Sequence, residues 1–213
     1  MIIWPTKNHS IFLMIQATLQ IVKPLSILEI GSGKSSRYFA EYAKEKKVKF
    51  RSVEENQEWV SRVNLDLEMS QLSTSHIIPV PIVGDWFEIH SMNDILNESS
   101  FWDFLMVDAP SGSGLGKRSS KEASKWLLKV VTSASTIVID DVHRRHNFEH
   151  LKELPGGFKE KDFLFFTYDI GNQLPNSIVV VSKTSKELKK VFKALNLEFV
   201  SGLRRGEELV HEI

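Results

Sequence analysis

A short apolar segment that ends in a carboxylate and two spaced glycines, Ile27-Leu28-Glu29-Ile30-Gly31-Ser32-Gly33, constrains the fold of this chain more than any other feature. An apolar run followed by glycines is typical of a buried strand that turns sharply into a helix, here from about Lys34. Glycine has no Cβ, so the backbone at Gly31 and Gly33 can come close to a ligand. The segment therefore predicts a strand, a tight turn and a helix, with room for a ligand at the turn.

Three known patterns resemble this turn, and the residues separate them only in part. A phosphate-binding P-loop would end as Gly33-Lys34-Ser35 does, but Leu28 stands where its first glycine belongs. A dinucleotide fingerprint needs a third small residue, and Ser36 fills that place imperfectly. The third pattern is a structural turn that binds nothing.

The carboxylate of Glu29 indicates the charge of the ligand. It would repel a pyrophosphate and would attract a cationic amino group. S-adenosylmethionine carries an ammonium group at its methionine end and a sulfonium at its sulfur. We therefore expect this turn to bind S-adenosylmethionine.

A second strand is expected over 48–53, and it ends at Glu54 and Glu55. In an open α/β sheet, ligands bind beyond the carboxyl ends of the strands, where the strand order reverses. An acid about twenty residues beyond the glycine turn can accept hydrogen bonds from ribose hydroxyls. Glu54 is thus a predicted ribose ligand.

Strand-like and helix-like segments alternate along the rest of the chain, which predicts a Rossmann-like, doubly wound α/β fold with helices on both faces. The sheet is expected to be mainly parallel and seven-stranded. We expect one domain over residues 1–213, with an N-terminal helix at about 8–22, a core at about 24–182, and a C-terminal helix and tail at 183–213. The expected strands are 27–30, 48–53, 76–83, 101–107, 135–139, 163–168 and 178–181. The expected helices of the core and tail are 34–46, 57–71, 120–131, 145–154 and 185–195.

Composition excludes several classes of protein. The 213 residues contain 27 basic and 27 acidic side chains, so no overall charge attracts nucleic acid or an anionic membrane. The absence of cysteine excludes disulfides, thiolate catalysis and cysteine-based zinc sites. No apolar run reaches the roughly 18 residues of a membrane span, and the N-terminus lacks the features of a signal peptide. We expect a cytoplasmic protein that binds a small molecule and no nucleic acid.

Carboxylates follow the ends of successive expected strands, and in a parallel sheet they would share one rim. Such a cluster is electrostatically costly unless cations or hydrogen-bond donors face it, so we expect a site there. The acids are Glu29, Glu54, Asp85, Asp108, Asp140 and Asp141.

Each acid beyond Glu54 has a candidate role. Asp85 could accept from the adenine amine while Trp86 stacks on the ring, although a turn aspartate beside a core tryptophan explains the pair nearly as well. Asp108 is expected beside the transferred methyl group and is a candidate catalytic and cofactor-binding residue. Asp108, Asp140 and Asp141 together could hold Mg²⁺, or one of them could act as general base. Asp141 could also cap the helix that follows.

The histidines after these acids allow two interpretations. His143 is a candidate for acid–base catalysis because it lies just beyond Asp141. His143, His146 and His150 would share one helix face, and with Asp140 they could form the metal site of a hydrolase. No glutamate completes that site in the sequence, and solvated histidines explain the same pattern.

A glycine-rich loop at 111–120 follows Asp108 directly. It could close over the acceptor as a lid, with Lys117 and Arg118 binding an anionic group of the substrate. A flexible connector with solvated charges is the alternative.

Several segments together resemble class I S-adenosylmethionine-dependent methyltransferases: 28–33, 52–60 and Ile139-Asp140-Asp141. Within that superfamily, 102–112 followed by 141–144 resembles the glucuronoxylan 4-O-methyltransferase group and its bacterial relatives, which act on uronic acid hydroxyls. That group's Gly-Arg-Met-type segment is only loosely echoed by 116–119.

The resemblance implies a set of roles for the site residues. The methionine part would bind at Glu29, Gly31, Ser32 and Gly33, and the ribose at Glu54. The adenine would bind at Asp85 and Trp86. By position, Asp108 and Asp141 resemble the metal-binding acids of catechol-type O-methyltransferases.

The sequence thus predicts an S-adenosylmethionine-dependent O-methyltransferase that acts on a sugar, a uronate or another small acceptor, with a divalent cation such as Mg²⁺ as an optional second cofactor. Two alternatives stay open. One is a non-catalytic module that binds S-adenosylmethionine, and the other is the metal-dependent hydrolase built on Asp140, His143, His146 and His150.

Overall fold

The computed structural model describes the N-terminal half of the chain almost continuously and, beyond residue 109, mainly the strands and one helix. The described residues are 9–84, 86–99, 101–109, 136–139, 163–168, 176–181, 185–194 and 199–201. The predicted helices at 120–131 and 145–154 lie outside them.

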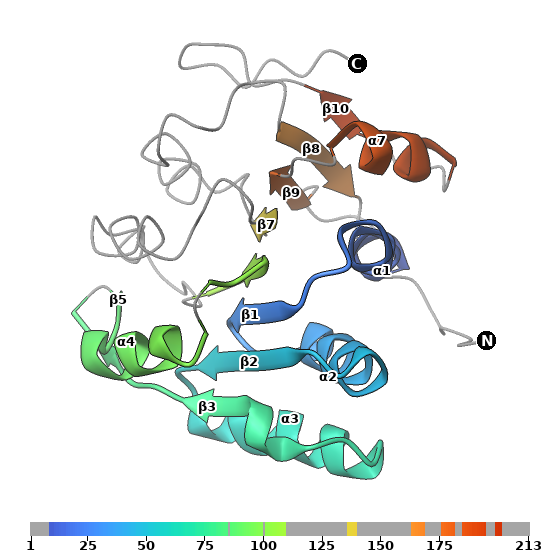
Figure 1. Cartoon of the computed structure of the whole chain (residues 1–213). Coiled ribbons are helices and arrows are strands. Elements are labelled where there is room, and N and C mark those ends of the chain that lie inside the picture. Colours follow the sequence, from blue (N-terminus) through green and yellow to red (C-terminus); the bar gives the residue numbers. More distant parts are fainter. Residues whose placement is uncertain are drawn as a thin grey trace.

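One large sheet organises the described residues, and Figure 1 shows its strands stacked through the middle of the molecule. The strand order is β10-β8-β9-β7-β6-β1-β2-β3. The five strands from β7 to β3 pair in parallel, whereas β9 is antiparallel to both β7 and β8. The strands are β1 (Ser26–Ile30), β2 (Lys49–Glu54), β3 (Ile77–Pro79), β6 (Phe104–Val107), β7 (Thr136–Ile139), β8 (Phe163–Tyr168), β9 (Asn176–Val181) and β10 (Phe199–Ser201).

This order confirms the predicted Rossmann-like class, but the expected number of strands was wrong. Among the residues that the structure describes, the sheet has eight strands rather than seven. The additional strand is β10, which pairs antiparallel with β8 through Phe199 and Phe166. Sequence reasoning assigned this segment to the tail, because three residues are too few to show a strand period.

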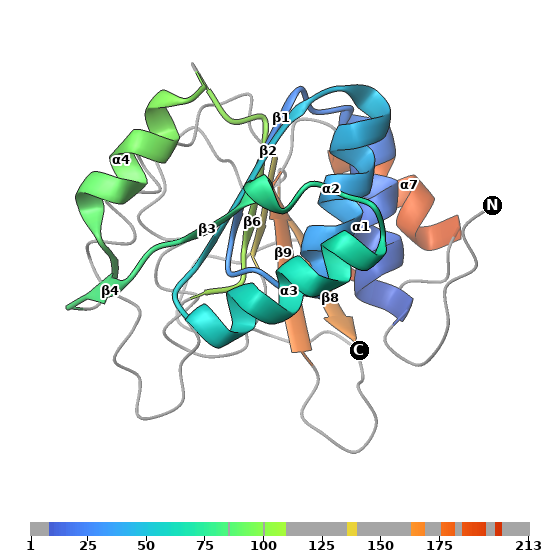
Figure 2. The same ribbon diagram turned by 90° about the horizontal axis from the view of Figure 1, so that it is seen from below.

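Helices cover both faces of the sheet. Figure 2 shows α1, α2, α3 and α7 on one face and α4 on the other. The helices are α1 (His9–Val22), α2 (Lys34–Lys46), α3 (Gln57–Met69), α4 (Ile89–Asn97) and α7 (Ser185–Ala194), with a short 3-10 turn η1 at Thr74–His76. The strand order reverses at β1, because β2 lies on one side of it and β6 on the other.

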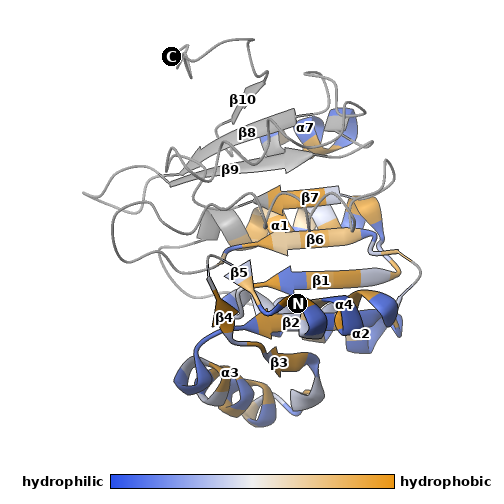
Figure 3. Cartoon of the chain, turned by 90° about the vertical axis from the view of Figure 1, so that its left-hand side faces the viewer, coloured by the Kyte–Doolittle hydropathy of each residue, from blue (hydrophilic) through white to orange (hydrophobic). Residues whose placement is uncertain are grey.

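A packed aromatic cluster joins helix α2 to the sheet. The ring of Phe39 on α2 lies 5.8 Å from that of Phe50 on β2 and 5.5 Å from that of Phe104 on β6. All five residues of β1 are buried, and Figure 3 shows the central strands coloured mainly as hydrophobic. Burial of this kind fixes β1 rigidly between its neighbours, so the turn that follows it starts from a fixed point.

The predicted strand at 76–83 is interrupted by prolines, and the prediction was wrong beyond Pro79. Strand β3 stops at Pro79, and Pro81 follows after one residue; neither has an N–H for the ladder. The chain then forms a separate hairpin of β4 (Ile82–Val83) and β5 (Trp86–Phe87). In the described part of the chain, β3 is the last strand on its side of the large sheet.

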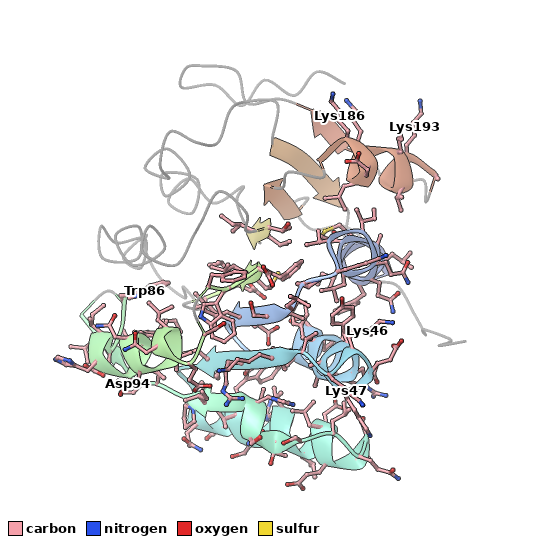
Figure 4. All side chains as sticks on the ribbon, in the orientation of Figure 1. Lys46, Lys47, Trp86, Asp94, Lys186 and Lys193 are labelled. Carbon is pink, nitrogen blue, oxygen red and sulfur yellow. The ribbon has the colours of Figure 1, made fainter. Side chains whose placement is uncertain are left out.

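Lysines cover the outward face of α7. Lys186, Lys189, Lys190 and Lys193 are exposed, whereas Leu188 is buried. Figure 4 shows Lys186 and Lys193 pointing away from the sheet. The arrangement is that of an amphipathic helix with a solvated charged face.

Candidate cofactor site

The turn after β1 is seated against the end of β6, and Gly31 makes this possible. Gly31 has φ +95°, and its N–H donates to the carbonyl of Val53 at 2.8 Å. A Cβ placed on Gly31 would lie 2.6 Å from the carbonyl oxygen of Asp108 and 2.8 Å from Cβ of Ala109. Both the backbone angle and the close approach therefore require glycine at this position.

Gly33 has a different environment. Its φ of −176° is extended backbone that any residue adopts. The nearest described atom to an added Cβ would be Ser35 Oγ, at 4.0 Å. Neither backbone angle nor packing within the described residues demands glycine here. Open space over a backbone at the start of a helix is the kind of cradle in which a ligand is bound.

Glu29 lies beneath this turn and is fully buried, at 0% exposure. Three serine hydroxyls donate to its carboxylate: Ser35 to Oε1 at 2.5 Å, and Ser36 and Ser52 to Oε2 at 2.5 and 2.6 Å. Burial raises the pKa of Glu29 to about 7, and these hydroxyls only partly offset that effect. Because Ser35 and Ser36 begin α2 and Ser52 belongs to β2, Glu29 joins three elements.

Glu29 has a structural role in the turn beside the ligand role predicted for it. Its carboxylate has no exposed surface. It orders the turn from below, because Ser36 Oγ, which donates to Glu29, also accepts from the N–H of Gly33 at 2.8 Å. The sequence showed the acid but not the three hydroxyls that enclose it.

Glu54 holds the other side of the turn. Its Oε2 accepts from the N–H of Ser32 at 2.9 Å and from Ser32 Oγ at 3.2 Å, and its Oε1 accepts from the N–H of Asn56 at 2.9 Å. Burial raises its pKa, and these donors act in the opposite direction. A carboxylate oxygen accepts about two hydrogen bonds, so Oε1 can accept another donor beside the Asn56 N–H that the structure describes.

Trp59 is a part of the site that sequence reasoning gave no role. Its indole Nε1 donates to the carbonyl oxygen of Ser32 at 2.6 Å, from the first turn of α3. Asn56 caps this helix by accepting from the N–H groups of Glu58 and Trp59. An asparagine before a helical segment is a recognisable cap signal, but the contact between Trp59 and Ser32 spans 27 residues and has no local signature.

Asp108 lies where the sequence predicts it, beside the glycine turn. Its side chain is exposed, and its N–H donates to the carbonyl of Ile30 at 2.8 Å. The structure thus brings together Glu29, Gly31, Ser32, Gly33, Glu54 and Asp108. The other predicted site residues lie outside the described part of the chain: Asp85, Lys117, Arg118, Asp140, Asp141, His143, His146 and His150.

Trp86, the predicted stacking partner of the adenine, is buried. It is 2% exposed, and its ring meets that of Phe87 edge-on, at 5.3 Å and 88°. Figure 4 shows it beside α4. A ring that is already packed on its surroundings has no face open to a ligand, so its burial supports the core role that the sequence left open.

Neither a metal centre nor a membrane helix is visible in the described residues. No group of three histidine, cysteine or acidic side chains there is close enough to bind a metal ion. No described helix has the length and apolarity to cross a bilayer.

Comparison with known proteins supports the fold. No family model matches the chain, and no curated protein matches its sequence. Among solved structures, an O-methyltransferase from Bacillus cereus in complex with SAH matches with TM-score 0.55 and 18% identity, covering 84% of this chain and 83% of the other. Cofactor-bound Rv0187 from MTB matches with TM-score 0.55 and 14% identity, over 85% and 82%. An rRNA methylase from Streptococcus thermophilus matches with TM-score 0.51 and 11% identity, over 84% and 99%.

At these identities the comparison concerns the fold. The chain shares the Rossmann-like fold of these solved methyltransferases. These neighbours differ in the acceptors that their names indicate, so the acceptor has to be argued from this chain's own residues.

Proposed function

We propose that this protein is an S-adenosylmethionine-dependent methyltransferase that methylates a hydroxyl oxygen of a small acceptor, with sugars and uronates as the first candidates. The observation that carries the proposal is the open backbone at Gly33. It lies between two anchored carboxylates at the point where the strand order reverses, which is where α/β sheets bind nucleotides.

The residues around the turn fit this cofactor. Gly33 leaves space at the start of α2, where a methionine carboxylate would meet the N-terminus of the helix. Glu54 Oε1 can accept a ribose hydroxyl beside the Asn56 N–H. Glu29 contributes from beneath, by fixing Ser36 and through it Gly33. Asp85 stays a predicted adenine ligand.

The reaction follows from these positions. When bound, the cofactor supplies an electrophilic methyl group on a sulfonium. Asp108 is exposed at the end of β6, next to Gly31, and can accept the proton of the acceptor hydroxyl as its oxygen attacks. Most of the rate would come from holding donor and acceptor in line. Asp141 and His143 stay candidates for the same proton transfer.

The acceptor side of the proposal rests on predicted residues. Lys117 and Arg118 would bind the carboxylate of a uronate, because a guanidinium pairs with a carboxylate in a bidentate manner. A uronate acceptor is therefore expected to react faster than the matching neutral sugar.

Calorimetric titration with S-adenosylhomocysteine tests the cofactor proposal. We expect wild-type protein to bind it and Glu54→Ala to bind at least about tenfold more weakly, the effect of losing one or two hydrogen bonds to a charged group. Glu58→Ala is the matched control, since it removes an exposed glutamate four residues away. Equal affinity of Glu54→Ala and wild type would contradict the ribose role.

Methyl transfer to a panel of acceptors then tests the reaction. The panel contains uronate-bearing oligosaccharides, neutral oligosaccharides and structured RNA, with release of S-adenosylhomocysteine as the common readout. Transfer to RNA alone would overturn the small-acceptor proposal. Cofactor binding without transfer to any acceptor would identify a non-catalytic module.

A further inference from the structure

Four hydrogen bonds form a closed circuit around the glycine turn. The N–H of Ser32 donates to Glu54 Oε2 at 2.9 Å, and the N–H of Asn56 donates to Glu54 Oε1 at 2.9 Å. Asn56 Oδ1 accepts from the N–H of Trp59 at 3.1 Å. The indole Nε1 of Trp59 donates to the carbonyl of Ser32 at 2.6 Å, which closes the circuit. The circuit joins the end of β2, the start of α3 and the turn.

The circuit fixes two successive peptide groups of the turn. Glu54 holds the peptide between Gly31 and Ser32 through its N–H. The peptide between Ser32 and Gly33 is held at its carbonyl by Trp59 and at its N–H by Ser36 Oγ, at 2.8 Å. Trp59 is therefore one of two contacts that set the orientation of the backbone at Gly33, where the cradle is open.

The indole of Trp59 suits a positioning role better than a packing role. Trp59 is 39% exposed and is not a member of the buried core. Its nitrogen is engaged with the turn, and the guanidinium of Arg62 lies 5.9 Å from the ring centroid. Arg62 is one turn further along the same helix and lies over the ring, but it makes none of the hydrogen bonds of the circuit. Arg62→Ala is therefore a control that changes the surroundings of the ring and keeps its N–H.

We propose that Trp59 is a positioning residue of the cofactor site, which holds the peptide between Ser32 and Gly33 in the orientation that receives the methionine end of the cofactor. This inference rests on the proposed function, because it assigns a further residue to the same site. It predicts that the single N–H group of an indole, rather than its ring, controls cofactor affinity.

Trp59→Phe tests the inference by keeping an aromatic ring and removing the donor. We expect its affinity for S-adenosylhomocysteine to fall about fivefold to tenfold, as for loss of one neutral hydrogen bond. Amide hydrogen exchange in the segment 32–36 should become several-fold faster without ligand. Arg62→Ala should leave both the affinity and the exchange rates at wild-type values.

The outcomes separate this inference from the proposed function. If wild type binds S-adenosylhomocysteine and Trp59→Phe binds it equally well, the positioning role is wrong and the proposed function stands. If wild type does not bind, both are overturned. If Trp59→Phe loses its cooperative unfolding transition, Trp59 serves the fold and the positioning role is wrong.

A second measurement keeps the ring and the fold intact. The chain has five tryptophans, so labelling with ¹⁵N-tryptophan gives few indole N–H signals, and the signal absent from Trp59→Phe belongs to Trp59. In wild type and in Arg62→Ala, this signal should shift when S-adenosylhomocysteine is added. An unchanged Trp59 signal at saturating ligand would overturn the inference.

Discussion

The two ends of the central strands each have a carboxylate that binds backbone N–H groups, yet only one end resembles a ligand site. At the amino end, Asp103 Oδ2 accepts from the N–H groups of Leu25 and Ser26 at 2.8 and 3.2 Å. At the carboxyl end, Glu54 accepts from the N–H groups of Ser32 and Asn56 at 2.9 Å. The two carboxylates are thus similar in their hydrogen bonding.

The difference lies in the backbone that each carboxylate holds. Asp103 ties the start of β1 to the loop before β6, and its own carbonyl accepts from Thr136 at the start of β7. Glu54 ties down a turn in which Gly33 leaves space that the described residues do not fill. A hydrogen-bonded carboxylate therefore does not by itself indicate a site; an anchored backbone with open space above it does.

The largest effect is expected for Gly31→Ala. The new Cβ would meet the backbone of Asp108 at 2.6 Å, in a residue with φ +95°. Backbone strain and overpacking should together lower the free energy of unfolding by about 4 kcal/mol. Urea unfolding measures the change. A loss below about 1 kcal/mol would mean that the turn can move away from β6.

The second-largest expected effect is a pH dependence of the free energy of unfolding that comes from Glu29. Its folded-state pKa, about 7, lies above the ordinary 4.5, so the folded state binds this proton more tightly than the unfolded state. Its contribution to stability is therefore complete below about pH 4.5 and is lost as pH rises through 7. The difference corresponds to at most roughly 3 kcal/mol.

Glu29→Gln isolates this contribution, since other titrating groups cancel between the two proteins. The stability of wild type relative to Glu29→Gln should fall between pH 5 and pH 8 in denaturant titrations. A relative stability that stays constant over this range would show that the hydroxyls of Ser35, Ser36 and Ser52 keep Glu29 ionised.

Asp103→Ala tests whether the carboxylate at the amino end of the strands serves stability alone. It removes two backbone N–H partners at the amino end, which should cost about 2 kcal/mol in the free energy of unfolding. Affinity for S-adenosylhomocysteine should stay at the wild-type value, because the turn is at the other end. Weakened binding of S-adenosylhomocysteine in a fully folded Asp103→Ala protein would show that Asp103 also affects the ligand site, and that the two carboxylates do not differ in this respect.

The smallest effect on stability is expected for Gly33→Ala, for which the backbone is extended and the space is open. The free energy of unfolding should change by less than about 1 kcal/mol. Affinity for S-adenosylhomocysteine should nevertheless fall, because the methyl group would occupy the cradle. Unchanged affinity would place the ligand elsewhere.

The elements of the first half could be predicted because their signals are local. The apolar run of β1, the glycines after it and the periodicity of α1, α2 and α3 all lie within single segments, and the structure reproduces their bounds closely. Helix α4 was missed. Its first turn is capped by Glu88, which accepts from the N–H groups of His90 and Ser91 at 2.9 and 2.7 Å, and glutamate is an uncommon cap.

The acids of the site were predictable and their partners were not. Glu29 and Glu54 stand at the ends of strands, where the α/β rule places functional groups. Ser52 and Glu29 are 23 residues apart, and Trp59 and Ser32 are 27 apart. Such pairs exist only after β1, β2 and α3 have come together, so no window of sequence contains them.

The prolines at the edge of the sheet have a consequence for self-association. Strand β3 presents only three residues, one of them Pro79, and Pro81 follows after one residue. An edge this short, with two positions unable to donate, is a poor template for a strand from another copy. The prolines that end the expected long strand therefore disfavour pairing with a strand of another copy at this edge of the described sheet.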